Sequence, residues 1–401
     1  MSATPTSTRA SACISGARLQ FLNPGEIVLK TLVQLIPVWA SLALVLGASL
    51  IFRRRLGLYG HVVASGPGLA GLLLVGFWLF AAIFASRIEL FDPLSQIAEL
   101  QHAPPGAIDP HSGLPYLFGG DKLARDVFGR VIAGARIVLI IAPLATLLAL
   151  AVGIALGLPA GYFGGRIDAT LSFLANLVLA FPIILLFYLL VSPGILETPI
   201  PYVLAAIFFA FPILLFSIFF IAGYRARPAA LAVRLALTFI AGGWLFATFV
   251  FNADPFGLIQ VSPSTLNIFV AVALASGPGI FRIVRSLTLD IKTREYVFAA
   301  QTRGESPWYV MLWEILPNAR GPLIVDGCLR IGYTTILLGA LGYFGLGMPP
   351  ESPNWGTMIN ESSRFMRIYV HPALPPALAL MSFVLGLNLL ADAIREESLR
   401  D

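Results

Sequence analysis

The chain has few charged residues. Asp, Glu, Lys and Arg make up 12% of its 401 residues and hydrophobic residues 58%, whereas soluble globular domains carry roughly 25% charged residues. This scarcity excludes an ordinary soluble protein and indicates a polytopic membrane protein. No nucleic-acid partner is expected. The net charge of +5 is explained by arginine in the cytoplasmic loops of a membrane protein.

Motifs for metals and nucleotides are missing as well. The two cysteines, Cys13 and Cys328, stand in a polar tail and an apolar segment, so no disulfide is expected between them. The histidines are scattered over different loops and ends without a metal-ligand pattern: His61, His102, His111 and His371. No G-x-x-x-x-G-K-[ST] phosphate loop occurs. The sequence therefore predicts no metal, no cofactor, no catalytic residue and no ATP site of that kind.

Long apolar runs are abundant. A membrane-spanning helix needs about 20 apolar residues, and nine segments qualify as spans of an all-α, polytopic membrane helix bundle. They are 31–52, 67–86, 136–160, 169–191, 202–223, 235–251, 266–286, 321–345 and 373–391.

Basic residues predict the orientation of these spans. If nine spans alternate, the arginine-rich turns share one side, which the positive-inside rule makes cytoplasmic. The more acidic loops, including 87–135, then lie outside together with the amino terminus. This placement exports Arg9, Arg18 and Lys30, and the alternative is that 31–52 is re-entrant or interfacial.

The longest polar run in the second half of the chain covers residues 294–322. Its first part, Glu295 to Arg303, has helix-forming composition and is expected to carry the small pair Ala299 and Ala300 on its surface. Gly304 is suited to the left-handed conformation that ends a helix.

A second helix is expected directly after this glycine. Ser306 supplies an N-cap and Pro307 a first-turn proline. Pro317 is expected to stop this helix. Beyond it, Asp326 and Arg330 stand four residues apart, so that one helix face holds both and they can pair. A structural pair and a substrate contact both stay open for them.

These residues carry a family pattern. The run E-Y-V-F-A-A, followed by Gly304 and by I-L-P-N at 315–318, resembles the EAA loop of ABC-importer permeases, in the form of the dipeptide, oligopeptide and nickel subfamily. Other stretches resemble motifs of the same subfamily in the same order, and together they indicate its C-type permease. They are 119–137 (G-G-D-K-L-A-R-D-V-F-G-R-V-I-A-G-A-R-I), 160–168 (A-G-Y-F-G-G-R-I-D), 179–182 (L-A-F-P) and 344–359.

The resemblance implies a six-span permease core plus about three additional membrane segments. The implied parts are an extension (1–66) with one extra segment, a first core part (67–192) with the external loop 87–135, an inserted helical hairpin (193–260), and a second core part (261–401) with the coupling loop 287–320. It also implies a multi-pass protein of the bacterial inner membrane, in contact with lipid.

The implied function is half of the translocation pore of an ATP-driven importer of di- or oligopeptides. Its expected partners are a second permease subunit in a heterodimer, two ABC ATPase subunits that hydrolyse the ATP, and an extracytoplasmic solute-binding protein. The chain itself is then no enzyme. Alternatives are an ATPase-independent secondary transporter, a membrane assembly subunit, or nickel or another small solute as cargo.

Two groups of residues match the family's functional motifs. The ATPase-coupling loop is expected to use Glu295, Ala299, Ala300, Arg303, Gly304, Leu316, Pro317 and Asn318. The external motif consists of Asp121, Arg125, Asp126 and Arg130. For the external motif two interpretations stay open: contact with the binding protein or pore mouth, or an ion-pair cluster that holds the loop as a short amphipathic helix.

The chain departs from the family pattern at several positions. Phe298 precedes the alanine pair and Glu314 stands where peptide-type relatives often have His. Gly120 and Ala124 replace the usual Thr and Gly of the external motif, and a common Glu near residues 339–341 is missing. The resemblance therefore predicts the family more firmly than it predicts the cargo.

Overall fold

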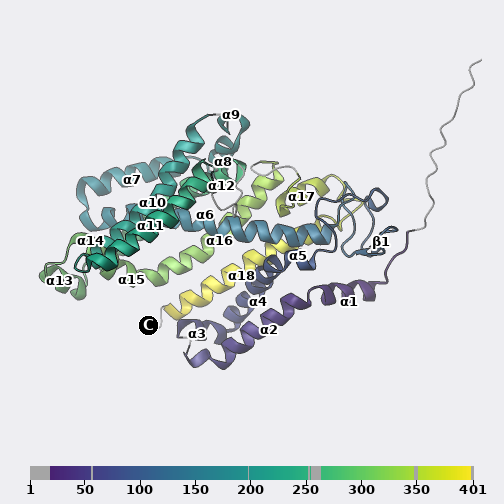
Figure 1. Ribbon diagram of the computed structural model, residues 1–401, viewed down its shortest axis with the longest axis horizontal. Coiled ribbons are helices and arrows are strands. Elements are labelled where there is room, and N and C mark those ends of the chain that lie inside the picture. Colours follow the sequence, from purple (N-terminus) through teal and green to yellow (C-terminus); the bar gives the residue numbers. More distant parts are fainter. Residues whose placement is uncertain are drawn as a thin grey trace, which may run out of the picture.

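The chain folds as a bundle of long helices (Figure 1). The computed structural model describes residues 19–398, apart from 56, 197, 252, 254–262 and 347–350. Seven helices in this part are long and apolar enough to cross a membrane. They are α4 (Gly66–Ile83), α6 (Val127–Phe163), α10 (Ile200–Tyr224), α11 (Pro228–Phe251), α12 (Pro263–Ile291), α16 (Arg320–Tyr343) and α18 (Leu374–Ser398).

Two further predicted spans are bent helix pairs. Helix α1 (Pro24–Gln34) meets α2 (Ile36–Ile51) at 55°, and α7 (Gly165–Leu179) meets α8 (Ile183–Val191) at 84°. If each pair is one span, the predicted total of nine is reached. The prediction of continuous spans at 31–52 and 169–191 is nevertheless wrong, because both are bent. In the second pair Pro182 lacks an N–H donor and disfavours a helical conformation at the residue before it, so the helix breaks there.

Short elements connect the long helices. Beside the bundle lie η1 (Arg53–Arg55), α3 (Leu58–Ala64), α5 (Ala85–Ile88), η2 (Ala98–Leu100), α9 (Pro193–Leu196) and α17 (Trp355–Ser363). Strands β1 (Ala107–Ile108) and β2 (Pro115–Tyr116) form an antiparallel pair in the external loop. Between α12 and α16 the chain forms α13 (Glu295–Thr302), α14 (Pro307–Tyr309), the π-helical η3 (Val310–Ile315) and α15 (Leu316–Asn318).

The core of the bundle forms around α6. One buried cluster joins α6 to α8, α10, α12 and α16, a second joins it to α4, α17 and α18, and a third joins it to α12 and η3. Glycines allow the closest approach between α6 and α12: a Cβ added at Gly153 would lie 2.4 Å from Ile280, and one at Gly157 would lie 2.7 Å from Val284. Small residues at such crossings let membrane helices pack backbone to backbone.

The two ends of the bundle are unlike. Figure 1 shows α1, β1 and α17 at one end of the long axis, and α13 and α14 at the other. The segment before α1 belongs to the first end, because Leu22 N–H donates to Gly106 O at 2.9 Å and Ile108 N–H to Gln20 O at 2.9 Å. Residues 20–22 therefore lie on the same side as the loop 87–135, as the alternating spans predicted.

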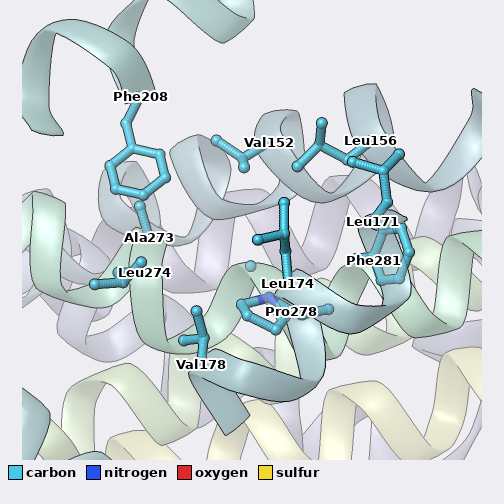
Figure 2. Close-up of a pocket in the computed structure, with 12 residues that line it drawn as sticks. Val152, Leu156, Leu171, Leu174, Val178, Phe208, Ala273, Leu274, Pro278 and Phe281 are labelled. Carbon is cyan, nitrogen blue, oxygen red and sulfur yellow. The ribbon is translucent and has the colours of Figure 1, made fainter. Parts of the chain in front are cut away.

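A cavity of about 130 Å³ lies between α6, α7, α10 and α12. Figure 2 shows Leu174 and Val178 of α7 facing Phe208 of α10 and Pro278 of α12 across it. Every labelled side chain that lines it is apolar. Such a lining suits hydrocarbon and offers no hydrogen bond to a polar cargo.

Candidate coupling element and external clamp

The coupling element, defined here as residues 295–318, begins with helix α13. Val297 and Ala300 are fully buried against η3, whereas Phe298 is 54% exposed and Ala299 is exposed. The prediction that both alanines lie on the surface is therefore wrong for Ala300. A helix of two turns presents only part of its circumference, and position 300 shares the inner face with position 297, three residues before it.

The turn after α13 is as predicted. Gly304 has φ +82°, a conformation that L side chains rarely adopt, and it ends the first helix. The side chain of Ser306 accepts the N–H of Tyr309 at 3.2 Å, and Pro307 occupies the first helical turn. Gly304 and Arg303 are both exposed.

The second helix differs from its prediction. It begins as α14, widens into the π-helix η3 and continues as α15 to Asn318, so Pro317 does not end it. Pro317 stands in the first turn of α15, directly after the π-helix, and offers no N–H to the carbonyl groups of η3. Leu316 is partly buried beside it, and Pro317 and Asn318 are exposed. A π-turn inside a helix is rare and occurs often at functional sites.

Polar contacts hold the coupling element loosely. Arg303 Nη2 lies 3.3 Å from Glu314 Oε1, and Gln301 donates to the hydroxyl of Tyr162 at the end of α6 at 3.2 Å. Asn318 donates to Glu314 O at 2.6 Å. Glu314, one of the departures from the family pattern, thus has its partner within the chain. Glu295 is exposed at the start of α13.

The opposite end of the bundle holds a buried ion cluster, here called the external clamp: Asp121, Arg125, Arg130 and Glu361. Arg125 donates to Asp121 at 2.8 Å and to Glu361 at 2.6 Å. Arg130 Nη1 lies 2.5 Å from Asp121 and 2.9 Å from Glu361. The two guanidinium groups are only 2% and 1% exposed. The clamp therefore joins the external loop to α17, which carries Glu361.

Asp126 belongs to the external motif but not to the clamp's ion pairs. Its carboxylate accepts the N–H groups of Phe128 and Gly129 at 3.2 and 2.9 Å and so caps α6. Burial raises the pKa of Asp126 to about 7, although these two N–H groups lower it. Of the second interpretation, the ion pairs of Asp121 with Arg125 and Arg130 are present and the short amphipathic helix is not. Asp121–Arg125 is a turn with Ala124 at φ +59°, and the helix that follows is α6 itself.

Helix α17 is seated firmly enough to carry one side of the clamp. Trp355 is fully buried and donates to Val131 O of α6 at 2.9 Å. Asn354 caps the helix by accepting Gly356 N–H at 2.7 Å. A Cβ at Gly356 would lie 1.9 Å from Gly339 O of α16, so only glycine fits there. The N-W-G part of the run 344–359 is thus a packing requirement.

Charged residues also fix the helices near the coupling element. Arg285 of α12 forms a two-pronged ion pair with Asp168 of α7, whose Nη2–Oδ2 distance is 2.5 Å. The preceding turn needs Gly164 and Gly165, with φ values of +65° and +56°. The motif 160–168 therefore positions a carboxylate for α12, a partner that the sequence alone did not reveal.

Asp326 and Arg330 do pair within α16, at 2.6 Å between Nε and Oδ2. Arg330 also donates to Ser276 O of α12 at 3.3 Å, and its guanidinium packs on Gly279, where a Cβ would lie 2.8 Å from Nη2. The pair therefore braces α16 against α12 next to Pro278, which interrupts the hydrogen bonds of α12.

The histidines do not form a metal site within the described residues, where no group of three or more His, Cys, Asp or Glu side chains could hold an ion. His102 stacks on Tyr369 at 4.7 Å, and His371 lies 3.3 Å from Gly120 O. Burial lowers the pKa of His371, although backbone contacts to Gly120 and Ala103 raise it. Both imidazoles pack where the loop 87–135 meets the segment between α17 and α18.

Comparison with known proteins decides the class of this chain. Residues 153–396 match the family described as "Binding-protein-dependent transport system inner membrane component". The chain belongs to this family. It is the C-type permease subunit of an ABC importer and a multi-pass protein of the inner membrane, as its motifs predicted.

The similar proteins are permease subunits themselves. The chain is 27% identical to the dipeptide transport system permease protein DppC of Alkalihalophilus pseudofirmus, over 82% of this chain and 84% of that protein. It is 29% identical to DppC of Haemophilus influenzae, over 82% and 88%. It is 28% identical to the glutathione transport system permease protein GsiD of Pectobacterium atrosepticum, over 84% and 86%. The family implies that a solute-binding protein and an ATPase work with this permease.

Proposed function

We propose that this permease forms half of a pore that imports short peptides, with the coupling element seated on an ABC ATPase in the cytoplasm. The support for the cargo is that similar permeases are named for dipeptides and glutathione. The proposed complex contains a second permease subunit, two ATPases and an external binding protein. Family membership favours this over an ATPase-independent transporter.

The observation that carries the coupling role is the division of α13 into two faces. Val297 and Ala300 anchor it inward, while Phe298 and Ala299 face water next to the charged Glu295 and Arg303. Tyr296 and Trp308 of the same element are exposed as well, and exposed apolar side chains that gather in one short element are typical of an interaction site. Phe298 is then the side chain that inserts into a groove of the ATPase, and the small side chain of Ala299 lets that groove close around it.

Helix α16 supports the other half of the proposal. Its exposed face is apolar and aromatic, with Tyr333 at 67% and Ile336 at 45% exposure. The pair Asp326–Arg330 lies in the same helix and braces it against α12. Because α16 follows the coupling element with a single residue between them, displacement of the element is passed directly to a helix whose open face is available to the second permease subunit.

The division of the chain into parts is also a proposal. The proposed parts are an extension to residue 66, a core interrupted at 193–260, and a core that resumes at 261. The support is that the α10–α11 hairpin lies between two blocks that carry the family's motifs. The family match begins at residue 153 and runs to 396 across that hairpin.

The test is Ala299→Glu in the complex expressed with its own ATPase, partner permease and binding-protein genes. Ala299 is exposed, so the variant is expected to fold and insert, but its carboxylate is placed in the proposed contact. Uptake of labelled dialanine and co-purification of the ATPase are expected to be lost. Ala300→Glu is unsuitable, since it buries a charge inside the element.

The matched control is Ala226→Glu, an exposed alanine in the turn between α10 and α11. It adds the same charge to another helix connection and is expected to leave both readouts unchanged. Normal ATPase co-purification with Ala299→Glu would refute the coupling role. Wild-type complex that transports neither dialanine nor glutathione would refute the peptide cargo alone.

A further inference from the structure

The α10–α11 hairpin touches the coupling element. Helix α10 packs on α6 and α12 within the core, and its last turns reach α14 and η3. The hairpin is thus a further link between the membrane core and this segment, which α6 and α12 also contact. The side chain of η3 with printed aromatic and hydrogen-bond contacts to α10 is Trp313.

Trp313 fits α10 closely. Its ring stacks on Phe219 with 4.5 Å between centroids and 17° between planes, and its Nε1–H donates to Phe219 O at 3.2 Å. A Cβ added at Gly223 would lie 2.3 Å from the indole, so the glycine leaves the space that the ring fills. Stacking, a hydrogen bond and a missing side chain all favour one orientation of the indole.

Both helices of the hairpin support this contact. Tyr224 meets Trp313 edge-on at 5.8 Å between centroids, and Arg234 of α11 lies 3.9 Å above the Tyr224 ring. From the other side Tyr309 of α14 stacks near Trp313 at 6.3 Å. Aromatic pairs and a cation over a ring each add stability beyond burial. The junction therefore joins α11, α10, η3 and α14.

The π-helix explains how Trp313 reaches α10. Its neighbours Met311, Leu312 and Ile315 are buried in the cluster formed with α12 and α6. The hydrogen bond of a π-turn spans one residue more than that of an α-turn, and so the side chains that follow are rotated around the helix axis. This leaves Trp313 directed at α10 while the others remain in the core.

From these contacts we propose that Trp313 is a positioning residue through which the hairpin moves with the coupling element. The inference rests on the proposed coupling function. Motion imposed on α13 by an ATPase then reaches the core along the chain into α16, through the packing of η3 on α6 and α12, and sideways through Trp313 into α10. The hairpin thereby holds the coupling element in register with the core while it moves.

The test is hydrogen exchange of the assembled complex, with and without ATP and vanadate. In the wild type, exchange in residues 217–224 of α10 is expected to change together with exchange in 295–318. In Trp313→Ala the change in 295–318 persists and the change in 217–224 is lost. Uptake of dialanine per ATP hydrolysed is expected to fall about tenfold, on the order of one aromatic stack and one hydrogen bond. Trp313→Phe, which keeps stacking, recovers most of it.

A steric variant keeps the test sharp if Trp313→Ala folds poorly. Gly223→Ala displaces the indole and is expected to reproduce the lost response of α10, while adding nothing when combined with Trp313→Ala. The proposal is overturned if 217–224 does not respond in the wild type, if it still responds in Trp313→Ala, or if the two substitutions are additive. Failure of the coupling role itself is recognised separately, by an ATPase that still binds the Ala299→Glu variant.

Discussion

Charged side chains are buried in the external clamp and exposed in the coupling element. In the clamp, two arginines that are 2% and 1% exposed share two carboxylates. In the coupling element the pair Arg303–Glu314 is 56% and 23% exposed. Buried charges must be paired or they strongly destabilise the fold, whereas exposed pairs exchange partners at little cost. One end is thus fixed by its charges, and the other keeps its charges available to a partner.

The largest effect is expected from breaking the clamp. Glu361→Ala leaves Arg125 and Arg130 with Asp121 alone, two buried positive charges against one negative. Removing one partner of a buried pair destabilises by about 3–5 kcal/mol. The measurement is the thermal unfolding midpoint in detergent, together with the yield of folded protein.

The control for this prediction is Glu351→Ala, an exposed carboxylate in the segment before α17. It removes the same charge outside the clamp and is expected to leave the midpoint unchanged. Equal midpoints for the two variants would show that the clamp is not what holds the external loop to α17.

An intermediate effect is expected from pH at the external end. Because burial raises the pKa of Asp126 to about 7, folded protein keeps this proton up to near neutrality, whereas the unfolded chain releases it near pH 4. Unfolding then releases a proton between pH 4 and 7, so stability falls as pH rises through this window and is level above it. The measurement is the unfolding midpoint from pH 5 to 8.

Asp126→Asn is the matched variant for the pH series. Asparagine caps helices as well as aspartate does, so α6 keeps its first turn while the titration is removed. Its midpoint is expected to vary less with pH than that of the wild type. Burial also raises the pKa of Glu89 in the same loop, and a slope that survives in Asp126→Asn would point to that residue instead.

The smallest effect is expected at the coupling element. Arg303→Ala removes an exposed ion pair, which contributes at most about 1 kcal/mol. The same thermal assay is therefore expected to show little change, in contrast to Glu361→Ala. A large loss of stability would mean that the coupling element is as rigid as the clamp, and the contrast between the two ends would disappear.

The turn in the coupling element and the start of its second helix were predictable from the sequence. Gly304 at positive φ, the Ser306 cap and Pro307 in the first turn follow from backbone sterics alone. The burial of Ala300 and the π-turn did not follow, because both depend on what packs against the element. Residues such as Trp313 and Phe219 are 94 positions apart in the chain.

The external motif shows the same limit. Its four charged residues were identified, but the partner that completes the clamp, Glu361, lies 236 residues beyond Arg125. Ala124, noted only as a departure from a family glycine, proves to stand at φ +59°, where glycine is the unstrained residue. The motif identified the position, but only the structure showed that its backbone conformation favours glycine.

The spans number nine, as predicted, if each bent helix pair counts as one span. Their shapes were not predicted, and α6 departs most. Its 37 residues, at about 1.5 Å each, exceed by far a hydrocarbon core of about 30 Å. At the external end the excess is enclosed by protein, since Val127, Phe128 and Val131 are buried against the external loop and α17.

This arrangement decides where hydrophobic mismatch acts. A change in bilayer thickness is expected to have little effect on the tilt of α6, because protein rather than lipid surrounds its protruding turns at the external end. Helix α11 packs chiefly on α10, and none of its central membrane window is buried. A thinner or thicker bilayer is therefore expected to tilt the hairpin first, and through Trp313 the lipid environment reaches the coupling element.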